Sequence, residues 1–172
     1  MIGAMAQQGS VLPHTPAPLG RVRTGVAVRA GTPHPDVTTP EALARALEAA
    51  DAIYFPDPQR ATAGIHFERV LRELGLLERL GPRLRTFPNG ATAMRELAAA
   101  ALGAPIGCTQ VTEILYTPGV ELVAPLPLRF ELATVYTAAV SARAADARTA
   151  ERFVALLAGA ESAALRAQSG FE

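Results

Sequence analysis

Apolar positions along this chain switch between the period of a strand and the period of a helix. Residues 24–29 (TGVAVR) have the β-branched alternation of a strand, and a short apolar run at 52–55 predicts a second one. From Ile65 the apolar residues recur at three- and four-residue steps, which predicts a helix over 63–74 that Gly75 ends with a left-handed cap. The pattern therefore indicates strands that alternate with helices.

The same alternation continues to the C-terminus. We expect further strands at 84–87, 104–108, 120–124 and 130–140, and further helices at 40–50, 76–80, 90–102, 110–115, 146–157 and 161–168. Residues 1–21 are rich in Gln, Pro and Gly, and we expect an extended or loop segment with room for one short strand or helical turn. Strands that alternate with helices predict an α/β fold with right-handed parallel crossovers.

Three of the predicted helices begin with small or polar residues directly after a strand. These residues are Thr62, Ala63 and Gly64 at the first junction, Asn89, Gly90 and Ala91 at the second, and Thr109 and Gln110 at the third. We expect Thr62, Asn89 and Thr109 to cap their helices. N–H groups in the first turn of a helix lack an intrahelical partner, so bare backbone there can hold an anion or an oxygen-rich group.

Parallel crossovers bring these three helix starts to one edge of the sheet, where open α/β sheets bind ligands. We therefore predict a ligand cleft in which backbone donors at Ala63, Gly64 and Gly90 face the Gln110 side chain. A bulky residue at Gly64 would then weaken binding without unfolding the lobe. Arg60 is the charged candidate for attracting an anion, with a plain surface arginine as the alternative. For any single junction, the alternative is an ordinary connection between a strand and a helix.

Composition excludes several function classes. The chain has 172 residues, of which 49% are hydrophobic, and this suffices for one core or two small lobes. Its 16 basic residues, all arginine, balance 16 acidic ones without forming a basic cluster, so we predict no nucleic-acid partner. No apolar run has the length of a membrane span, and the start MIGAMAQQGS lacks the regions of a signal peptide. We therefore expect a soluble chain that begins after any export signal.

Few side chains favour catalysis or metal binding. A single cysteine, Cys108, excludes an internal disulfide framework and a multi-cysteine metal site. Cys108 and His66 could form a thiol–imidazole pair, but a small buried residue and an exposed helix residue are the plainer interpretation. His14 and His34 lack the local spacing of a metal site, so we predict no metal and no cofactor. Glu113 could accept a hydrogen bond from a ligand or be a solvated or capping carboxylate.

Seven segments of the sequence, taken in order, resemble the substrate-binding proteins of molybdate-type ABC transporters. They are GVAVRAGTPHPD, TTPEAL, YFPDPQRATAGIHFERVLRELG, PNGATAM, GAPIGCTQVTEIL, PGVELVAPLP and TVYTAAV. The most specific parts are DPQRATAGIHF and IGCTQVTEIL, and the similarity runs from about Gly9 to the C-terminus. It implies a three-layer αβα lobe of type II periplasmic-binding (venus-flytrap) topology, with the C-terminal helices of an incomplete first lobe.

The resemblance also implies a division of the chain. Residues 1–21 would be a lead-in, residues 22–139 a ligand-binding lobe with both hinge strands, and residues 140–172 the C-terminal helices of the partial first lobe. The other half of that first lobe would precede residue 1.

A set of ligand-binding positions follows from the same resemblance. The family presents backbone donors at the positions that match Ala63 and Gly64, and at the position that matches Gly90 or Ala91. A tyrosine hydroxyl often contributes where this sequence has Gln110. A glutamine can donate an N–H as tyrosine donates an O–H, and it also brings an acceptor.

We therefore predict that the chain is not an enzyme and that it binds a small anionic or polar ligand. The resemblance implies an ABC transporter membrane component as partner and the periplasm as location. Two alternatives stay open, namely an effector-sensing regulatory domain of the same fold and an enzyme that uses Cys108 or Glu113. Apolar positions in the last two helices and the edge of strand 130–140 predict a homodimer or larger assembly. The competing arrangement is a monomer whose helices fold back on its own lobe under residues 1–21.

Overall fold

The chain folds into two compact units of mixed helix and strand. The computed structural model describes residues 2–101 and 103–172. We call residues 23–133 the central unit, and residues 2–22 together with Thr134–Glu172 the terminal unit. The helices are α1 (Ile2–Gln7), α2 (Pro40–Ala49), α3 (Thr62–Glu73), α4 (Leu77–Leu80), α5 (Gly90–Ala98), α6 (Val111–Tyr116), α7 (Ala147–Ala158) and α8 (Ala163–Gln168). The strands are β1 (Ala17–Arg29), β2 (Ile53–Pro56), β3 (Leu84–Phe87), β4 (Ile106–Gln110), β5 (Val120–Pro125) and β6 (Ala133–Ala138).

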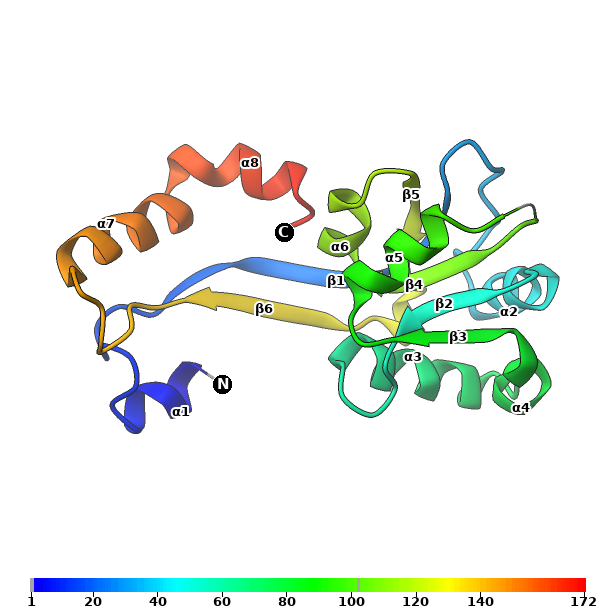
Figure 1. Ribbon diagram of the computed structural model, residues 1–172, viewed down its shortest axis with the longest axis horizontal. Helices are drawn as coiled ribbons and strands as arrows, with labels where there is room; N and C mark the ends of the chain where they lie inside the picture. The colour runs from blue at the N-terminus through cyan, green and yellow to red at the C-terminus, as the bar shows by residue number, and fades with distance from the viewer. Residues whose placement is uncertain (1, 102) are drawn as a thin grey trace. The chain divides into compact units, whose positions relative to one another are not determined.

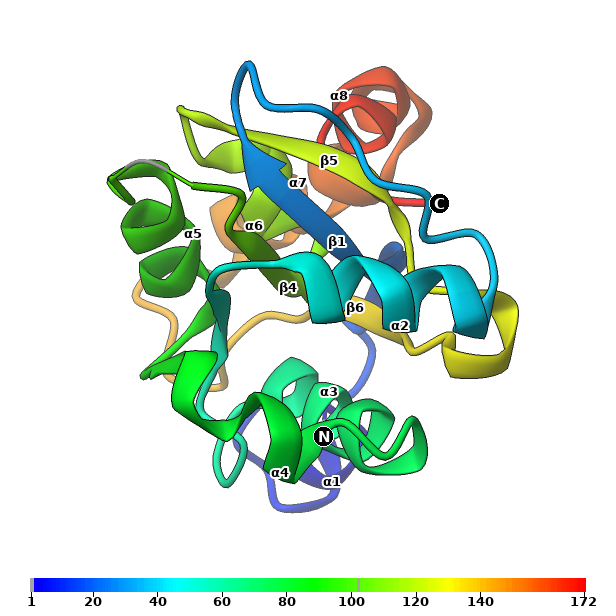
Figure 2. The ribbon, with the colours of Figure 1, turned by 90° about the vertical axis from the view of Figure 1, so that its right-hand side faces the viewer.

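One sheet organises the central unit. Its strand order is β3-β2-β4-β1-β5. β2 runs parallel to β3 and to β4, whereas β1 runs antiparallel to β4 and β5. Helix α3 lies on one face of β2 and β4, and α5 lies on the other (Figures 1 and 2). The α/β fold with parallel crossovers is thus confirmed, and β2, β3 and β4 end at the same edge of the sheet.

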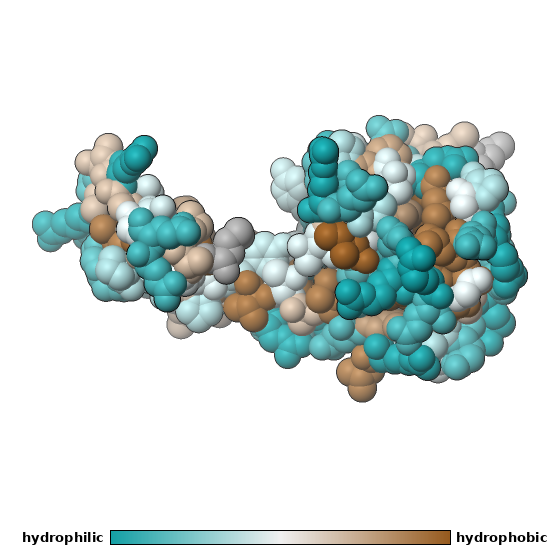
Figure 3. All heavy atoms as spheres, turned by 90° about the horizontal axis from the view of Figure 1, so that it is seen from below, coloured by the Kyte–Doolittle hydropathy of each residue, from teal (hydrophilic) through white to brown (hydrophobic). Residues whose placement is uncertain are grey.

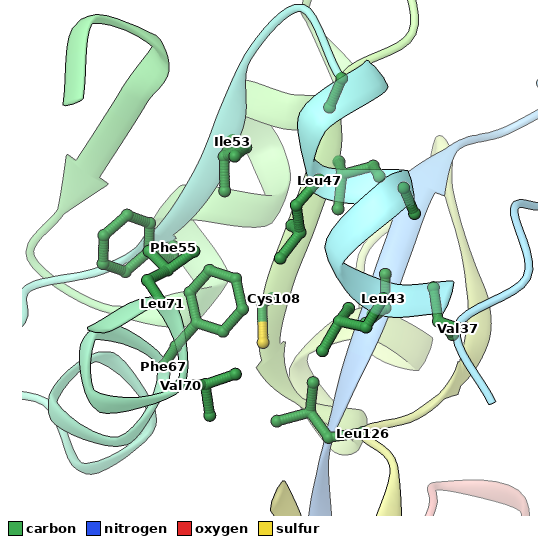
Figure 4. Packing of buried hydrophobic residues seen from close by; sticks show 14 of the residues in the cluster. Val37, Leu43, Leu47, Ile53, Phe55, Phe67, Val70, Leu71, Cys108 and Leu126 are labelled. Atoms are coloured by element: carbon green, nitrogen blue, oxygen red, sulfur yellow. The ribbon is translucent and has the colours of Figure 1, made fainter. Parts of the chain in front are cut away.

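The larger hydrophobic core lies between the sheet and helices α2 and α3. Phe55 of β2 packs edge-on against Phe67 of α3, with 5.3 Å between the ring centroids. Both side chains are almost completely buried, as is Cys108 of β4. Figure 4 shows the Cys108 sulfur directed into this cluster, toward Phe67 and Leu43. Even-numbered residues of β4 therefore face α2 and α3.

A smaller core lies on the opposite face, under α5 and α6. It contains Met94 and Leu97 of α5 together with Ile114 of α6. Gly107 of β4 permits the close approach of α5, because a Cβ atom there would lie 2.6 Å from Met94 Cε and 2.7 Å from Leu97 Cδ2. Odd-numbered residues of β4 therefore face α5.

Several helix ends follow the predicted capping. Asn89 Oδ1 accepts from the Thr92 N–H at 2.8 Å and caps α5. Thr39 caps α2 in the same way, with Pro40 as the first helical residue. Gly75, after α3, has the left-handed φ of 69° that the sequence predicts. Asx and hydroxyl caps and C-terminal glycines are short-range features, so the sequence alone locates them.

Two predicted caps are wrong. Thr62 is the first residue of α3 and is exposed, and Ala61 holds the N-cap position without a side-chain bond. Thr109 lies inside β4, because pairing with β1 continues to Gln110 and keeps the chain extended through Thr109. Gln110 is then the residue that precedes α6, again without a side-chain cap bond.

Other boundaries differ from the sequence pattern. Residues 1–21 were expected to be an extended or loop segment with room for one short strand or helical turn, and they include both α1 and the first part of β1, which begins at Ala17. β6 is shorter than the predicted 130–140, because a 3-10 turn at Leu128–Phe130 precedes it. α5 ends at Ala98, and residue 102 of the predicted 90–102 helix lies outside the described residues. The division into lobes at 21/22 and 139/140 stays a prediction.

Apolar side chains reach the surface as separate areas among hydrophilic ones (Figure 3). In the terminal unit, Phe153 and Leu156 of α7 and Leu165 of α8 are exposed, and neither helix has a buried residue. Within the same unit, Tyr136 packs edge-on against Phe171, with 5.6 Å between the ring centroids. Across the described residues, no helix has the length and apolar character that crossing a membrane requires. The predicted homodimer stays a prediction.

Candidate functional site at the carboxyl edge of the sheet

The predicted ligand residues surround the edge where three parallel strands end. We call this the carboxyl edge, and it is marked by Pro56 at the end of β2, Phe87 at the end of β3 and Gln110 at the end of β4. Helices α3, α5 and α6 all begin there. The antiparallel β1 contributes Thr24, which lies opposite Gln110 in the pairing register. Because both ladder partners point to the same face of a sheet, Thr24 and Gln110 lie together on the face that α3 covers.

The start of α3 is closed on one side by its own turn. Ala63 and Gly64 are both buried. A Cβ atom at Gly64 would lie 2.2 Å from the Pro56 carbonyl oxygen and 2.4 Å from that of Asp57. The Ala61 N–H donates to the Asp57 carbonyl at 3.0 Å, which fixes the turn. The fold therefore requires glycine at position 64. The sequence-based expectation was that a bulky residue there would weaken binding without unfolding the lobe. The close contacts instead indicate that such a residue would also destabilise the fold.

The start of α5 is occupied by a carboxylate from α6. Glu113 Oε1 accepts from the Ala91 N–H at 3.2 Å, and Glu113 Oε2 accepts from the Thr109 hydroxyl at 2.5 Å. A Cβ atom at Gly90 would lie 2.0 Å from both Glu113 Oε2 and Thr109 Oγ1. The absence of a side chain at Gly90 thus makes room for this carboxylate, and the α5 start and Thr109 lie on the face away from Gln110.

Two polar side chains are buried on the α3 face of the edge. Gln110 is 6% exposed and Thr24 is 1% exposed. Among the described residues, the Thr24 hydroxyl oxygen has no hydrogen-bond partner. Buried hydroxyl groups nearly always have a partner, so an unsatisfied one at a sheet edge indicates a place that a water molecule or a ligand completes.

A hollow lies beside the ends of β2 and β3. Its volume is about 340 Å³, and Asp57, Arg60, Thr86, Phe87 and Pro88 line it. The lining has one positive side chain, the exposed Arg60, and one negative side chain, Asp57, so its formal charges balance. The lining does not include Gly64, Gly90 or Gln110, so a single cleft that joins these residues to Arg60 stays a prediction.

Cys108 and His66 do not have the surroundings of a catalytic pair. Complete burial among apolar side chains raises the pKa of the Cys108 thiol well above its ordinary value, because desolvation disfavours the thiolate. The His66 Nε2 atom is 2.8 Å from the Phe130 carbonyl oxygen, so the ring is held by the backbone. An enzyme mechanism that uses Cys108 therefore has no support from the geometry.

We expect the Cys108 thiol to be unreactive in the folded protein. Dithionitrobenzoate should modify it at least ~100-fold more slowly than in the chain unfolded by guanidinium, because reaction requires the core to open. Absorbance of the released thionitrobenzoate measures both rates. Equal rates in the two states would contradict the burial of this side chain.

The other two histidines form exposed pairs with glutamates. His34 Nε2 lies 2.9 Å from Glu121 Oε2, and this hydrogen bond holds the pKa of the Glu121 carboxyl below its ordinary value. His14 Nε2 lies 3.2 Å from Glu151 Oε1. Within the described part of the chain, no three His, Cys, Asp or Glu side chains cluster as metal ligands would.

Sequence reasoning missed the two most informative side chains. Thr24 was seen only as the start of a strand, and its burial beside Gln110 depends on strand register. Glu113 was considered without its partners, because its contact with Thr109 depends on how α6 follows the end of β4.

Comparison with known proteins assigns the chain to a family. Residues 1–172 match the family described as bacterial extracellular solute-binding protein. The periplasmic molybdate-binding protein of Azotobacter vinelandii has the same fold, with a TM-score of 0.76 and 21% identity over 99% of this chain and 73% of that one. The sulfate-binding protein of Mycobacterium tuberculosis has a TM-score of 0.61 and 18% identity over 99% of this chain and 64% of that one.

A curated relative corrects one expectation. An aconitate isomerase from a Pseudomonas species is 23% identical over 175 residues, which cover 98% of this chain and 62% of that enzyme. The chain thus spans about three fifths of the length of this relative. The prediction that the chain is not an enzyme is overturned by this match, because a relative along the whole chain is named for a reaction. The reason is that one fold supports both binding and turnover.

The predicted resemblance and the type II periplasmic-binding topology are confirmed by these matches. The match to the family extends over every residue of the sequence. The chain belongs to the bacterial extracellular solute-binding protein family.

Proposed function

We propose that the central unit binds a small anionic ligand at the carboxyl edge, as the substrate-binding component of an ABC transporter does. The observation that carries the proposal is the buried Thr24 hydroxyl, which has no partner among the described residues and lies next to Gln110. A ligand oxygen that accepts from Thr24 would satisfy this group. Membership of a solute-binding family supports the same assignment.

The α3 side of the carboxyl edge favours a negative ligand. Helix α3 has 12 residues and directs the positive end of its dipole toward the edge. The Arg60 guanidinium lies at the neighbouring hollow and offers N–H donors to a carboxylate or other oxyanion, with Asp57 balancing its charge in the same lining. That hollow, at about 340 Å³, is near the lower limit of small-molecule sites, so the ligand should be small.

The named relatives agree with an anionic ligand. The two solved structures are named for binding molybdate and sulfate, and the curated relative is named for aconitate, so all three names refer to anions. We accordingly expect this chain to bind a small anion and to deliver it to the membrane component of a transporter. The corresponding location is the periplasm or the cell exterior.

A thermal-shift series tests the proposal. Molybdate, sulfate, aconitate and citrate are compared with glucose as a neutral control. A ligand at 100 times its dissociation constant should stabilise the folded chain by about 2.7 kcal/mol. Thr24→Val should abolish most of that stabilisation without lowering the stability of the free protein, because the lost hydroxyl has no partner there among the described residues. No stabilisation by any anion would refute the proposed function.

A second function, isomerisation of an unsaturated polycarboxylate, is favoured by the match to aconitate isomerase. Such a reaction needs a positive site to hold the carboxylates and a base to move a proton. Arg60 and the α3 start can supply the first requirement, and Glu113 is a half-buried carboxylate near the same edge. Proton NMR of cis-aconitate incubated with the protein tests this function. Formation of trans-aconitate above the rate with heat-denatured protein supports it, and an unchanged spectrum refutes it.

A further inference from the structure

The carboxylate of Glu113 lies where an external anion would bind to α5. Its Oε1 accepts from the Ala91 N–H at 3.2 Å, and its Oε2 accepts from the Thr109 hydroxyl at 2.5 Å. Asn89 Oδ1 accepts from the next donor, the Thr92 N–H, at 2.8 Å. The donors of Ala91, Thr92 and Thr109 at this helix start are therefore all directed at acceptors of the protein itself.

The start of α5 has room for the Glu113 carboxylate. Gly90 has no side chain, and a Cβ atom there would lie 2.0 Å from Glu113 Oε2 and 2.6 Å from Glu113 Cδ. Glu113 lies in the first turn of α6, and its backbone oxygen accepts from the Thr117 hydroxyl at 2.7 Å. Both the main chain and the side chain of Glu113 are thus held in place.

A fixed carboxylate changes which ligands the edge accepts. It brings a full negative charge to a helix start whose dipole is equivalent to about half a positive charge, so the sign of the local field is reversed. An ionised carboxylate also only accepts hydrogen bonds, and the oxygens of a fully ionised oxyanion do the same. A tetrahedral dianion held between α3 and α5 would therefore meet repulsion on the α5 side.

We propose that Glu113 is a specificity-determining residue that excludes inorganic dianions such as molybdate and sulfate from the carboxyl edge. This inference rests on the proposed function, because it concerns the ligand of that same edge. The class of ligand that the carboxyl edge then accepts is an organic carboxylate. One carboxylate group would be held on the α3 face, near Gln110 and Thr24, and the rest of the molecule would extend toward Arg60.

A capping role alone would not need the charge. A glutamine at position 113 could accept from the Ala91 N–H through its amide oxygen and donate from its amide N–H to the Thr109 hydroxyl oxygen. It therefore keeps two hydrogen bonds and removes the negative charge. The variant Glu113→Gln therefore separates a specificity role from a structural one.

Isothermal titration with sodium molybdate, sodium sulfate and sodium citrate tests the inference. The buffer contains neither phosphate nor sulfate, and the ionic strength is low, because salt screens the repulsion. We expect the dissociation constants of Glu113→Gln for molybdate and sulfate to be at least ~10-fold lower than those of the unmodified protein, since like charges a few ångström apart repel strongly. The constant for citrate should change less. If Glu113→Gln does not fold, Glu113→Ala takes its place in the test. It also removes the charge and should show the same gain in affinity for molybdate and sulfate.

Glu96→Gln is the matched control. Glu96 is exposed on α5, so this variant makes the same change of net charge on the helix without altering the carboxylate at its start. Equal dianion affinity in the unmodified protein, Glu113→Gln and Glu113→Ala, together with measurable citrate binding, would overturn this inference and leave the proposed function standing. Binding of none of the three anions to any variant would overturn both.

Discussion

Replacing Phe67 with alanine is expected to lower the free energy of unfolding of the central unit by about 3 to 5 kcal/mol. The Phe67 side chain is completely buried in the larger core, where it packs edge-on against Phe55. Its removal takes away buried apolar surface and leaves a cavity that the surrounding strands cannot fill. Urea unfolding followed by circular dichroism gives the free energy, and the reactivity of the Cys108 thiol reports the opening of the same core.

Ile65→Ala is the control for Phe67→Ala. Ile65 lies two residues earlier on α3 and is 43% exposed, so its truncation removes much less buried surface. We expect a loss of less than about 1 kcal/mol for this variant. If the two variants unfolded at the same urea concentration, α3 would not be packed on the sheet as described.

Replacing Gly64 with valine is expected to destabilise the central unit by about 3 kcal/mol. The added Cβ atom would lie 2.2 Å from the Pro56 carbonyl oxygen and 2.4 Å from that of Asp57, and neither backbone oxygen can move without shifting the turn between β2 and α3. A lower thermal midpoint without any ligand is the measurement. Gly64→Ala should have the same sign of effect, because the clash already arises at Cβ.

Gly81→Ala is the matched glycine control. A Cβ atom at Gly81 would meet no heavy atom within 4 Å, and its φ of −41° is one that alanine adopts readily. We expect its stability to be unchanged or slightly higher, because alanine restricts the unfolded chain. An unaltered thermal midpoint for Gly64→Val would show that the turn is not tight, and the variant would then serve as a probe of ligand binding.

Short-range patterns account for the elements that were predicted correctly. Apolar periodicity locates α3 and its stop at Gly75, and the Asn89 side chain needs only the three residues that follow to cap α5. The α/β alternation with parallel crossovers is also a local pattern repeated along the chain. The end of β4 is different, because whether Thr109 is strand or cap depends on pairing with Gly25, a residue 84 positions earlier (109 − 25).

The candidate site likewise combines residues that the sequence indicated with residues that only the structure revealed. Sequence alone indicated the helix starts, Arg60 and Gln110 as candidates, and the family resemblance that the comparisons confirm. Only the tertiary structure decided that Glu113 occupies the start of α5 and that Thr24 lies buried beside Gln110. The physical reason is that helix periodicity and capping act over a few residues, whereas strand register and the packing of α6 against α5 bring together side chains that are distant in the chain. Burial, which turns a threonine hydroxyl or a glutamate into a functional candidate, arises from that packing.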